Sequence, residues 1–164
     1  MMRRFLCTPI LFVFFVSCSG YEFTYSKDPK IKEIEKKTNY VIVGDDISIA
    51  KIKLIEELGR SGVDSVFLLN VGIEKISTPI VIEKDATVSK TEIKHSVSYS
   101  LLNEIKNCEI LSKNVTTKST YSSSSSGYSF STDLSEEEVI TKNLNNNIDE
   151  FLDYVVSFNG DLSC

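Results

Sequence analysis

The sequence has 164 residues, with 18 basic and 23 acidic side chains and a formal net charge of −5. This length is enough for one domain with a substantial core, and an acidic balance without a basic cluster argues against nucleic acid as a partner. A single histidine and the absence of any Cys-x-x-Cys pair argue against a zinc site, and no cofactor is expected.

Residues 1–17 have the pattern of a signal peptide for export. Two arginines precede an apolar run over 5–16, which is too short to span a bilayer because a span needs roughly 20 apolar residues. Cys18 directly follows Ser17, and a small residue before a cysteine at this place resembles the lipobox of bacterial lipoproteins. The resemblance implies cleavage before Cys18 and acylation of its thiol. The alternative is an ordinary signal peptide that is cut near Ser17.

Acylation of Cys18 would hold the protein on a membrane without a spanning helix, because each buried methylene contributes about 0.8 kcal/mol. Ser19, rather than an acidic residue, follows the cysteine, which resembles lipoproteins that travel to the outer membrane. The expected location is therefore the cell outer membrane, on its periplasmic side. Without residues 1–17 the mature chain has 147 residues, 16 basic and 23 acidic side chains, and a net charge of −7.

Residues 18–37 are expected to form an N-terminal tether. Tyr21, Phe23 and Tyr25 alternate with polar residues, and the stretch that ends at Lys37 is rich in charge. Two interpretations of the aromatic residues stay open. They form either a segment that lies on a partner or on the membrane surface, or a short edge strand or flexible spacer.

The globular domain is expected to cover residues 38–158, and residues 159–164 form a C-terminal tail. Asp46 has the position of an N-cap for the first helix, and Ser135 with Glu138 has the form of a capping box for the last one. In chain order, the predicted elements are a strand at 40–43, a helix at 47–58, a strand at 66–77 that 80–82 extends beyond Pro79, strands at 87–102 and 108–122, and a helix at 136–158.

The element order β-α-β-β-β-α predicts an α+β fold. We expect a two-layer α/β sandwich, in which two amphipathic helices cover one face of a mostly antiparallel four-stranded sheet. Cys108 opens the last strand, and the last helix must run back along that strand, so the C-terminal tail returns toward Cys108. Because leftover thiols in an oxidising compartment tend to pair, we predict a disulfide between Cys108 and Cys164. Two separate thiols are the alternative.

The sequence offers no group of residues that predicts catalysis. His95 is the single imidazole, and its place in the alternation puts it on the apolar face of its strand, where a hydrogen-bonded core histidine is expected. No serine lies in a G-x-S-x-G elbow, and no Gly-rich phosphate loop occurs. We therefore expect that the protein is not an enzyme.

The mature chain resembles LptE, the family of lipopolysaccharide-assembly lipoproteins, in its divergent alphaproteobacterial versions. The similarity lies in the order of Cys18 with Gly20 and Tyr21, a strand and short helix before a three-strand meander, the stretches 97–102 and 117–121, and the acidic-capped helix 135–158. The resemblance implies a protein that plugs the lumen of the LptD β-barrel, helps that barrel assemble and contacts lipopolysaccharide.

Lysines are the candidate contacts for lipopolysaccharide. In the family, basic residues near the turn between the second and third strands are implicated in this contact, and Lys84 is the nearest match. Lys90, Lys94 and Lys118 share the solvent side of their strands and could meet the phosphates of lipid A; the alternative is a solvated sheet face. The rival functions are a different outer-membrane lipoprotein, such as an auxiliary of a lipid-transport ABC system or a secretion pilot, and a small secreted hydrolase.

Overall fold

The computed structural model describes residues 27–82, 88–122 and 129–162. They form four strands and three helices. In chain order these elements are α2 (Pro29–Ile34), β1 (Thr38–Gly44), α3 (Ile47–Leu58), β2 (Phe67–Ile82), β3 (Val88–Asn103), β4 (Cys108–Ser122) and α4 (Ser129–Ser157).

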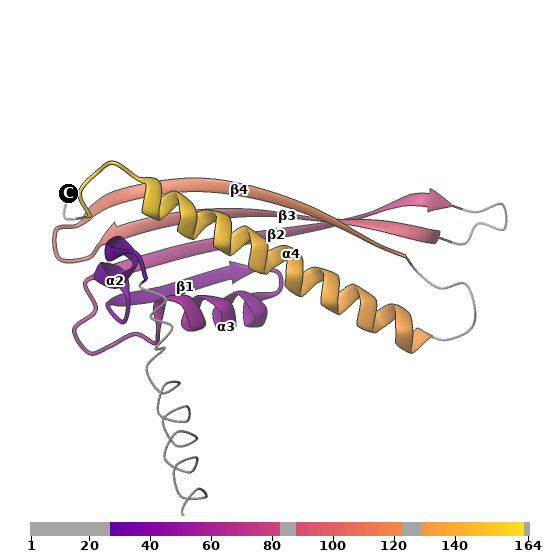
Figure 1. The fold of residues 1–164 in the computed structure, drawn as a ribbon, viewed down its shortest axis with the longest axis horizontal. Helices are drawn as coiled ribbons and strands as arrows, with labels where there is room; N and C mark the ends of the chain where they lie inside the picture. Colours follow the sequence, from indigo (N-terminus) through magenta and orange to yellow (C-terminus); the bar gives the residue numbers. More distant parts are fainter. Residues whose placement is uncertain (1–26, 83–87, 123–128, 163–164) are drawn as a thin grey trace, which may run out of the picture.

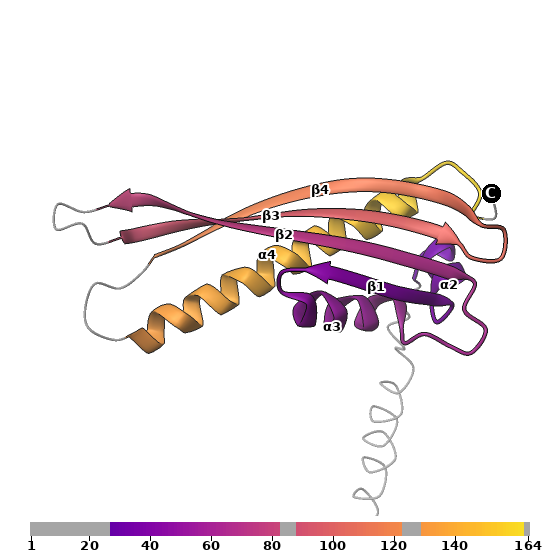
Figure 2. The same cartoon turned by 180° about the vertical axis from the view of Figure 1, so that it is seen from behind.

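The four strands form one sheet in the order β1-β2-β3-β4. β1 runs parallel to β2, with Thr38 opposite Phe67, whereas the pairs β2–β3 and β3–β4 are antiparallel. Figures 1 and 2 show the helices on one face of this sheet, with α4 lying across the strands. The predicted α+β fold of two layers is therefore confirmed, and the sheet is mixed only at β1.

Alternation along the strands and helical spacing build one core between the two layers. Alternate residues of the long strands face the helices, and those that lie over the middle of the core are apolar, while α3 and α4 each present an apolar stripe to them. Tyr99 of β3 stacks on Phe151 of α4, with ring centroids 4.1 Å apart. The main buried residues of these elements are Ala50, Leu54, Leu58, Phe67, Leu69, Val71, Ile73, Val97, Tyr99, Leu101, Leu111, Val115, Leu144, Ile148, Phe151 and Val155.

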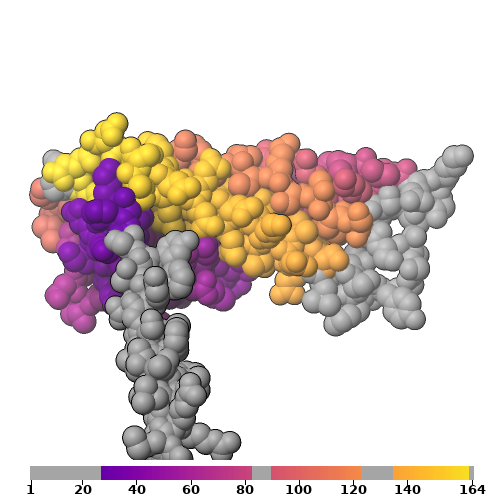
Figure 3. Space-filling view, in the orientation of Figure 1, coloured from indigo at the N-terminus to yellow at the C-terminus, as the bar shows by residue number. Residues whose placement is uncertain are grey.

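A short helix, α2, precedes β1, and the sequence pattern did not predict it. The Asp28 side chain caps this helix by accepting from a backbone amide of its first turn. Ile31 and Ile34 of α2 are buried in the core, and so is Leu162 beyond the end of α4. Figure 3 shows α2 beside the C-terminal part of α4. The packed domain is therefore wider than the expected range 38–158.

The last helix begins earlier than predicted. α4 starts at Ser129, seven residues before the predicted start at Glu136. Ser135 thus lies inside the helix, so the predicted capping box with Glu138 is wrong. β2 passes through Pro79 with a register shift on its far side, which agrees with the predicted interruption there.

Gly44 ends β1 at a position that only glycine fits. Its φ of 111° lies in the left-handed region, and an added Cβ would lie 1.9 Å from the carbonyl oxygen of Ile73. The turn that follows takes the chain from β1 to α3 on the helix side of the sheet.

Candidate functional site

The face of the sheet away from the helices carries small polar side chains at its centre. Figure 2 views the molecule from this side, which we call the open face. Two neighbouring rows of residues across its centre are Asn70–Ser100–Ser112 and Gly72–Ser98–Asn114. Because these side chains are short, the face has two shallow hollows of about 380 and 340 Å³. A partner on this side would meet hydroxyl and amide groups close to the backbone of the sheet.

Three of the predicted lysines lie together on the open face, beyond the end of β1. Lys94 of β3 is directly opposite Lys118 of β4. Lys90, four residues before Lys94 on β3, is opposite Ser122. Because side chains two residues apart point to the same side of a strand, the three lysines share one side, as their alternation predicted. We call Lys90, Lys94 and Lys118 the lysine strip. Lys84 lies outside the described residues.

The lysine strip has unbalanced charge. Like charges directly opposite each other in a sheet are destabilising, and Lys94 and Lys118 form such a pair. Glu92 offsets part of this repulsion, because its carboxylate lies 3.3 Å from Nζ of Lys118. A bound anion between the two ammonium groups would therefore stabilise this end of the sheet.

Apolar side chains lie beside the lysine strip. Ile76 is opposite Lys94 and Val81 is opposite Lys90 on the neighbouring strand β2, and their side chains are 40% and 44% exposed. A surface that joins ammonium groups to exposed aliphatic side chains suits a molecule with both an anionic group and an apolar part.

His95 is fully buried beneath α4, on the apolar face where it was predicted. Its Nε2 lies 3.2 Å from Oδ2 of Asp46, and its Nδ1 lies 3.1 Å from the amide nitrogen of Asn143. An amide NH2 group can only donate, so Nδ1 accepts and Nε2–H donates to Asp46. Both ring nitrogens are thus engaged inside the protein, which makes His95 a structural residue.

Asp46 holds the N-cap position of α3, but it does not make the predicted capping bond. Its φ of 50° is left-handed, and its side chain bonds no amide of the first turn. Its carboxylate instead accepts from Nζ of Lys75 at 3.0 Å and from the ring of His95. Charge-assisted hydrogen bonds are stronger than neutral ones. The Asp46 carboxylate therefore bonds the Lys75 ammonium in preference to the backbone amides of the first turn of α3.

The sequence interpretation missed two buried asparagines on α4. Asn147 accepts a bond from the Tyr99 hydroxyl at 2.8 Å and donates to the Val115 carbonyl at 3.1 Å, while Asn143 donates to the Ile93 carbonyl at 3.2 Å. Burial raises the pKa of Tyr99, which keeps its hydroxyl a donor. The two asparagines are four residues apart beside the apolar stripe, and that spacing was the available signal.

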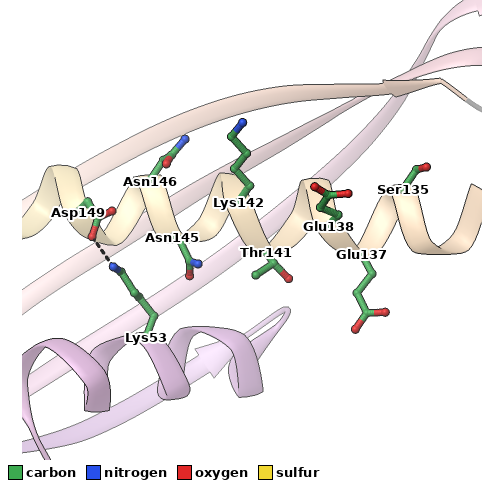
Figure 4. Close-up of a pocket in the computed structure, with 9 residues that line it drawn as sticks. All are labelled: Lys53, Ser135, Glu137, Glu138, Thr141, Lys142, Asn145, Asn146 and Asp149. Atoms are coloured by element: carbon green, nitrogen blue, oxygen red, sulfur yellow. Dashed lines mark ion pairs between the residues drawn. The ribbon is translucent and has the colours of Figure 1, made fainter.

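A polar groove of about 810 Å³ lies along the outer side of α4 (Figure 4). At one end, Nζ of Lys53 from α3 bonds Asp149 of α4 at 2.8 Å and Glu57 at 2.7 Å. Burial opposes the charge of Lys53, but the bonds to the two carboxylates outweigh it and raise the pKa of this lysine. The residues that line the groove are Lys53, Ser135, Glu137, Glu138, Thr141, Lys142, Asn145, Asn146 and Asp149. Lys53, through its ion pair with Asp149, links α3 to α4.

Cys108, the one cysteine within the described residues, is disulfide-bonded. It begins β4 at the end of the sheet where α4 also ends (Figure 1). Its partner lies outside the described residues, as do Cys18 and Cys164. The pairing with Cys164 and the acylation of Cys18 therefore stay predictions.

Within the described ranges, no helix combines the length and the apolar character that crossing a bilayer requires. The same residues hold no group of three or more His, Cys, Asp or Glu side chains placed to bind a metal ion. α4 is long enough, at 29 residues, but it carries charged side chains along most of its length.

Comparison with known proteins finds solved structures of similar fold but no protein of similar sequence. Neither a family model nor a curated protein matches this sequence. Among solved structures, the fold is similar to that of a candidate lipoprotein from Caulobacter crescentus, with a TM-score of 0.61 and 12% identity over 77% of this chain and 93% of that chain.

Two further lipoproteins are similar. Rare lipoprotein B from Shewanella oneidensis has a TM-score of 0.52 and 10% identity, over 73% of this chain and 93% of its own. A minor lipoprotein from Acinetobacter baumannii has a TM-score of 0.52 and 11% identity, over 76% and 92%. At this identity the likeness is one of fold, so the chain shares the fold of these bacterial lipoproteins.

Proposed function

We propose that the protein is an outer-membrane lipoprotein of the LptE type, which Cys18 anchors to the periplasmic side of the membrane. It acts without catalysis as a plug and assembly partner of an LptD-like β-barrel in lipopolysaccharide transport. The observation that carries this proposal is the fold, which is shared with bacterial lipoproteins over nearly their whole length. The signal-like segment that ends at Cys18 supports the same class of protein.

The open face supports the role of a barrel plug. The lumen of a large outer-membrane barrel is polar and wet. The serine, threonine and asparagine side chains of the open face can form hydrogen bonds to the inner wall of such a barrel, directly or through water. Because these side chains are short, they allow the wall to approach the sheet closely. A sheet with one apolar face, and with a second face that is polar at its centre, is therefore suited to keep its core while that centre lies against a polar surface.

The lysine strip supports contact with lipopolysaccharide. Lipid A carries phosphates next to acyl chains, and the strip places ammonium groups next to exposed Ile76 and Val81. The lysine strip and the Cys18 anchor are independent features, so the lipopolysaccharide contact and the lipid anchor are tested separately.

Co-purification tests the proposal in the cell that encodes the protein. A C-terminally tagged chain is isolated from detergent-solubilised envelopes, next to a Cys18→Ala variant that cannot be acylated at this position. We expect palmitate label on the first chain only, and a very large β-barrel bound at equal stoichiometry. An unlabelled wild-type chain would overturn the lipid anchor, and isolation without a barrel would overturn the plug.

Depletion separates the proposal from its rivals. Loss of the protein should leave the barrel partner unassembled and reduce the surface glycolipid. An auxiliary of a lipid-transport ABC system or a secretion pilot would leave barrel assembly intact. A hydrolase would be revealed if a serine-directed probe labelled the native protein, and this result would overturn the non-catalytic role.

A further inference from the structure

β2 ends in three consecutive aliphatic residues, Ile80, Val81 and Ile82, which we call the ribbon tip. Their side chains are 46%, 44% and 63% exposed. Among the residues that the structure describes, this is the one run of consecutive exposed aliphatic side chains. Single exposed apolar side chains are normal on a protein surface, whereas contiguous ones next to polar residues mark a place where the protein meets another molecule.

The neighbouring elements leave the ribbon tip uncovered. β1 pairs with β2 only as far as Ile73, and β4 pairs with β3 only as far as Lys90. Ile82 therefore has β3 alone beside it, at Val88. Figures 1 and 2 show this end of the two strands opposite α2, where the start of α4 has diverged from the sheet. The β-branched residues of the tip favour an extended strand, although they contribute to no core.

Exposed aliphatic side chains lie on both sides of the ribbon tip. Successive side chains of a strand point to opposite sides, so Val81, opposite Lys90, points to the open face and Ile82 points to the other side. A rigid surface laid against one face of the sheet would cover one of these side chains and leave the other in water. A medium that surrounds the end of the strands covers both, and the boundary between the headgroups and acyl chains of a lipid bilayer is such a medium.

The charge next to the ribbon tip favours a surface with negative headgroups. Lys90 lies directly opposite Val81. The other two residues of the lysine strip, Lys94 and Lys118, follow on the same face, and Glu92 offsets only one of the three ammonium groups. The chain as a whole has a formal net charge of −5, so this end is opposite in sign to the molecule. Clustered lysines next to a membrane contact attract anionic lipid.

We propose that the ribbon tip inserts into the interface of a lipid bilayer that carries anionic phosphate headgroups. Interfacial segments bury their apolar side about 5–10 Å into the boundary between headgroups and acyl chains, and three extended residues span about 10 Å. Lys90 then holds its ammonium among the headgroups, while its apolar stem lies along the boundary. Glu137 and Glu138 lie on α4, in the other layer (Figure 4), so the open face is the side that leans toward the bilayer.

The backbone limits the insertion to the interface. Beyond Ile73, the outer edge of β2 pairs with no strand of the described chain, and unpaired backbone groups do not enter the hydrocarbon core. Pro79 lies in this stretch and has no backbone N–H that would need a partner. The ribbon tip is therefore suited to a shallow and reversible contact.

A second copy of the chain fits the ribbon tip less well. Two tips that packed on each other through their open faces would bring the two lysine strips together, and like charges across an interface oppose association. A layer of anionic headgroups supplies the opposite charge. The insertion needs neither acylation of Cys18 nor a barrel, so its failure is distinct from a failure of the proposed function.

Tryptophan fluorescence tests the insertion, because the chain contains no tryptophan. Ile82→Trp places a single probe in the ribbon tip, and Val63→Trp places a matched probe at a fully exposed position between α3 and β2. Both are made in the mature chain with Cys18→Ala, so that no acyl chain contributes. With vesicles of phosphatidylethanolamine and phosphatidylglycerol, we expect blue-shifted emission and quenching by brominated acyl chains for Ile82→Trp only.

Cosedimentation with the same vesicles measures the affinity. Ile80→Ser combined with Ile82→Ser should weaken binding at least about tenfold, because the apolar area that enters the interface is lost. Val63→Ser combined with Ile105→Ser removes two exposed aliphatic side chains elsewhere on the surface, and it should leave binding unchanged within about twofold.

Four outcomes would overturn this proposal. The emission of Ile82→Trp does not respond to vesicles, or both probes are quenched alike. Equal insertion into vesicles of phosphatidylcholine alone removes the role of anionic headgroups. A blue shift that rises with protein concentration in the absence of lipid assigns the ribbon tip to a second copy of the chain.

Discussion

The end of the molecule that holds α2 and the end that holds the lysine strip are made by the same long strands, but they are packed in different ways. At the α2 end, four strands meet three helices, and the contact is mostly apolar. Beyond the end of β1, the sheet has three strands and only α4 above it (Figure 1). There the helix contact includes the buried polar residues His95 and Asn143.

Because of this difference, the α2 end contributes most to the stability of the fold, whereas the far end offers a surface for binding. The α2 end holds the stacked rings of Tyr99 and Phe151, and Lys30 ties the end of α4 to α2. The far end exposes Ile76, Val81 and the lysine strip, where no packing would be lost if a ligand replaced water. Substitutions at the α2 end should therefore change folding, and those at the far end should change binding.

Phe151→Ala should have the largest effect. The ring is 1% exposed and stacks on Tyr99, so its removal leaves a cavity and should cost about 3–5 kcal/mol of unfolding free energy. Urea unfolding measures this change. Asp153→Ala, at an exposed position of the same helix, is the control and should stay within about 0.5 kcal/mol of the wild type. A loss below about 1 kcal/mol for Phe151→Ala would contradict the packing at this end.

Asn147→Ala should have the next largest effect, because it breaks the polar contact between α4 and the sheet. The Tyr99 hydroxyl loses its acceptor and the Val115 carbonyl loses a donor, and a buried group without a partner costs about 1–3 kcal/mol. Asn146→Ala on the exposed side of α4 makes the same chemical change without those bonds. Equal unfolding free energies for the two variants would show that the buried bonds contribute nothing.

The sequence predicted the framework because the framework depends on local periodicity. The helix at 47–58 was predicted with its exact bounds, since its apolar residues recur at helical spacing and Gly59 ends it. α2 was missed because six residues are too short for a periodic signal, although Asp28 followed by Pro29 is a typical helix start. α4 was started too late because Ser135 and Glu138 imitate a capping box in its interior.

The candidate site was predictable only in part. Alternation was enough to place Lys90, Lys94 and Lys118 on one side of the sheet. Which residues face each other across strands depends on the register, so the pairing of Lys94 with Lys118 needed the structure. The carboxylate of Asp46 was assigned to the nearest helix start, because its actual partners, Lys75 and His95, lie 29 and 49 positions away in the sequence.

Lys30→Met should weaken the α2 end by about 1 kcal/mol. Its ammonium donates to the carbonyls of Val156 and Phe158 at the end of α4, where a cation is favourable to the helix dipole. Lys32→Met on the exposed side of α2 removes the same charge and should have little effect. Thermal unfolding of the two variants measures the difference. A similar midpoint in both would show that the bonds from α2 to α4 do not hold this end together.

Lys94→Gln should have the smallest effect on folding, and of the opposite sign. Removing one ammonium relieves the repulsion with Lys118, so the unfolding free energy should rise by about 0.2–1 kcal/mol. Binding to vesicles that contain anionic lipid should fall about fivefold, because one lysine near such a surface contributes about 1 kcal/mol. Lys51→Gln on the exposed side of α3 makes the same charge change outside the strip and should leave both quantities nearly unchanged. Equal binding by the two variants would mean that the far end is a solvated surface, and that net charge alone draws the protein to the vesicle.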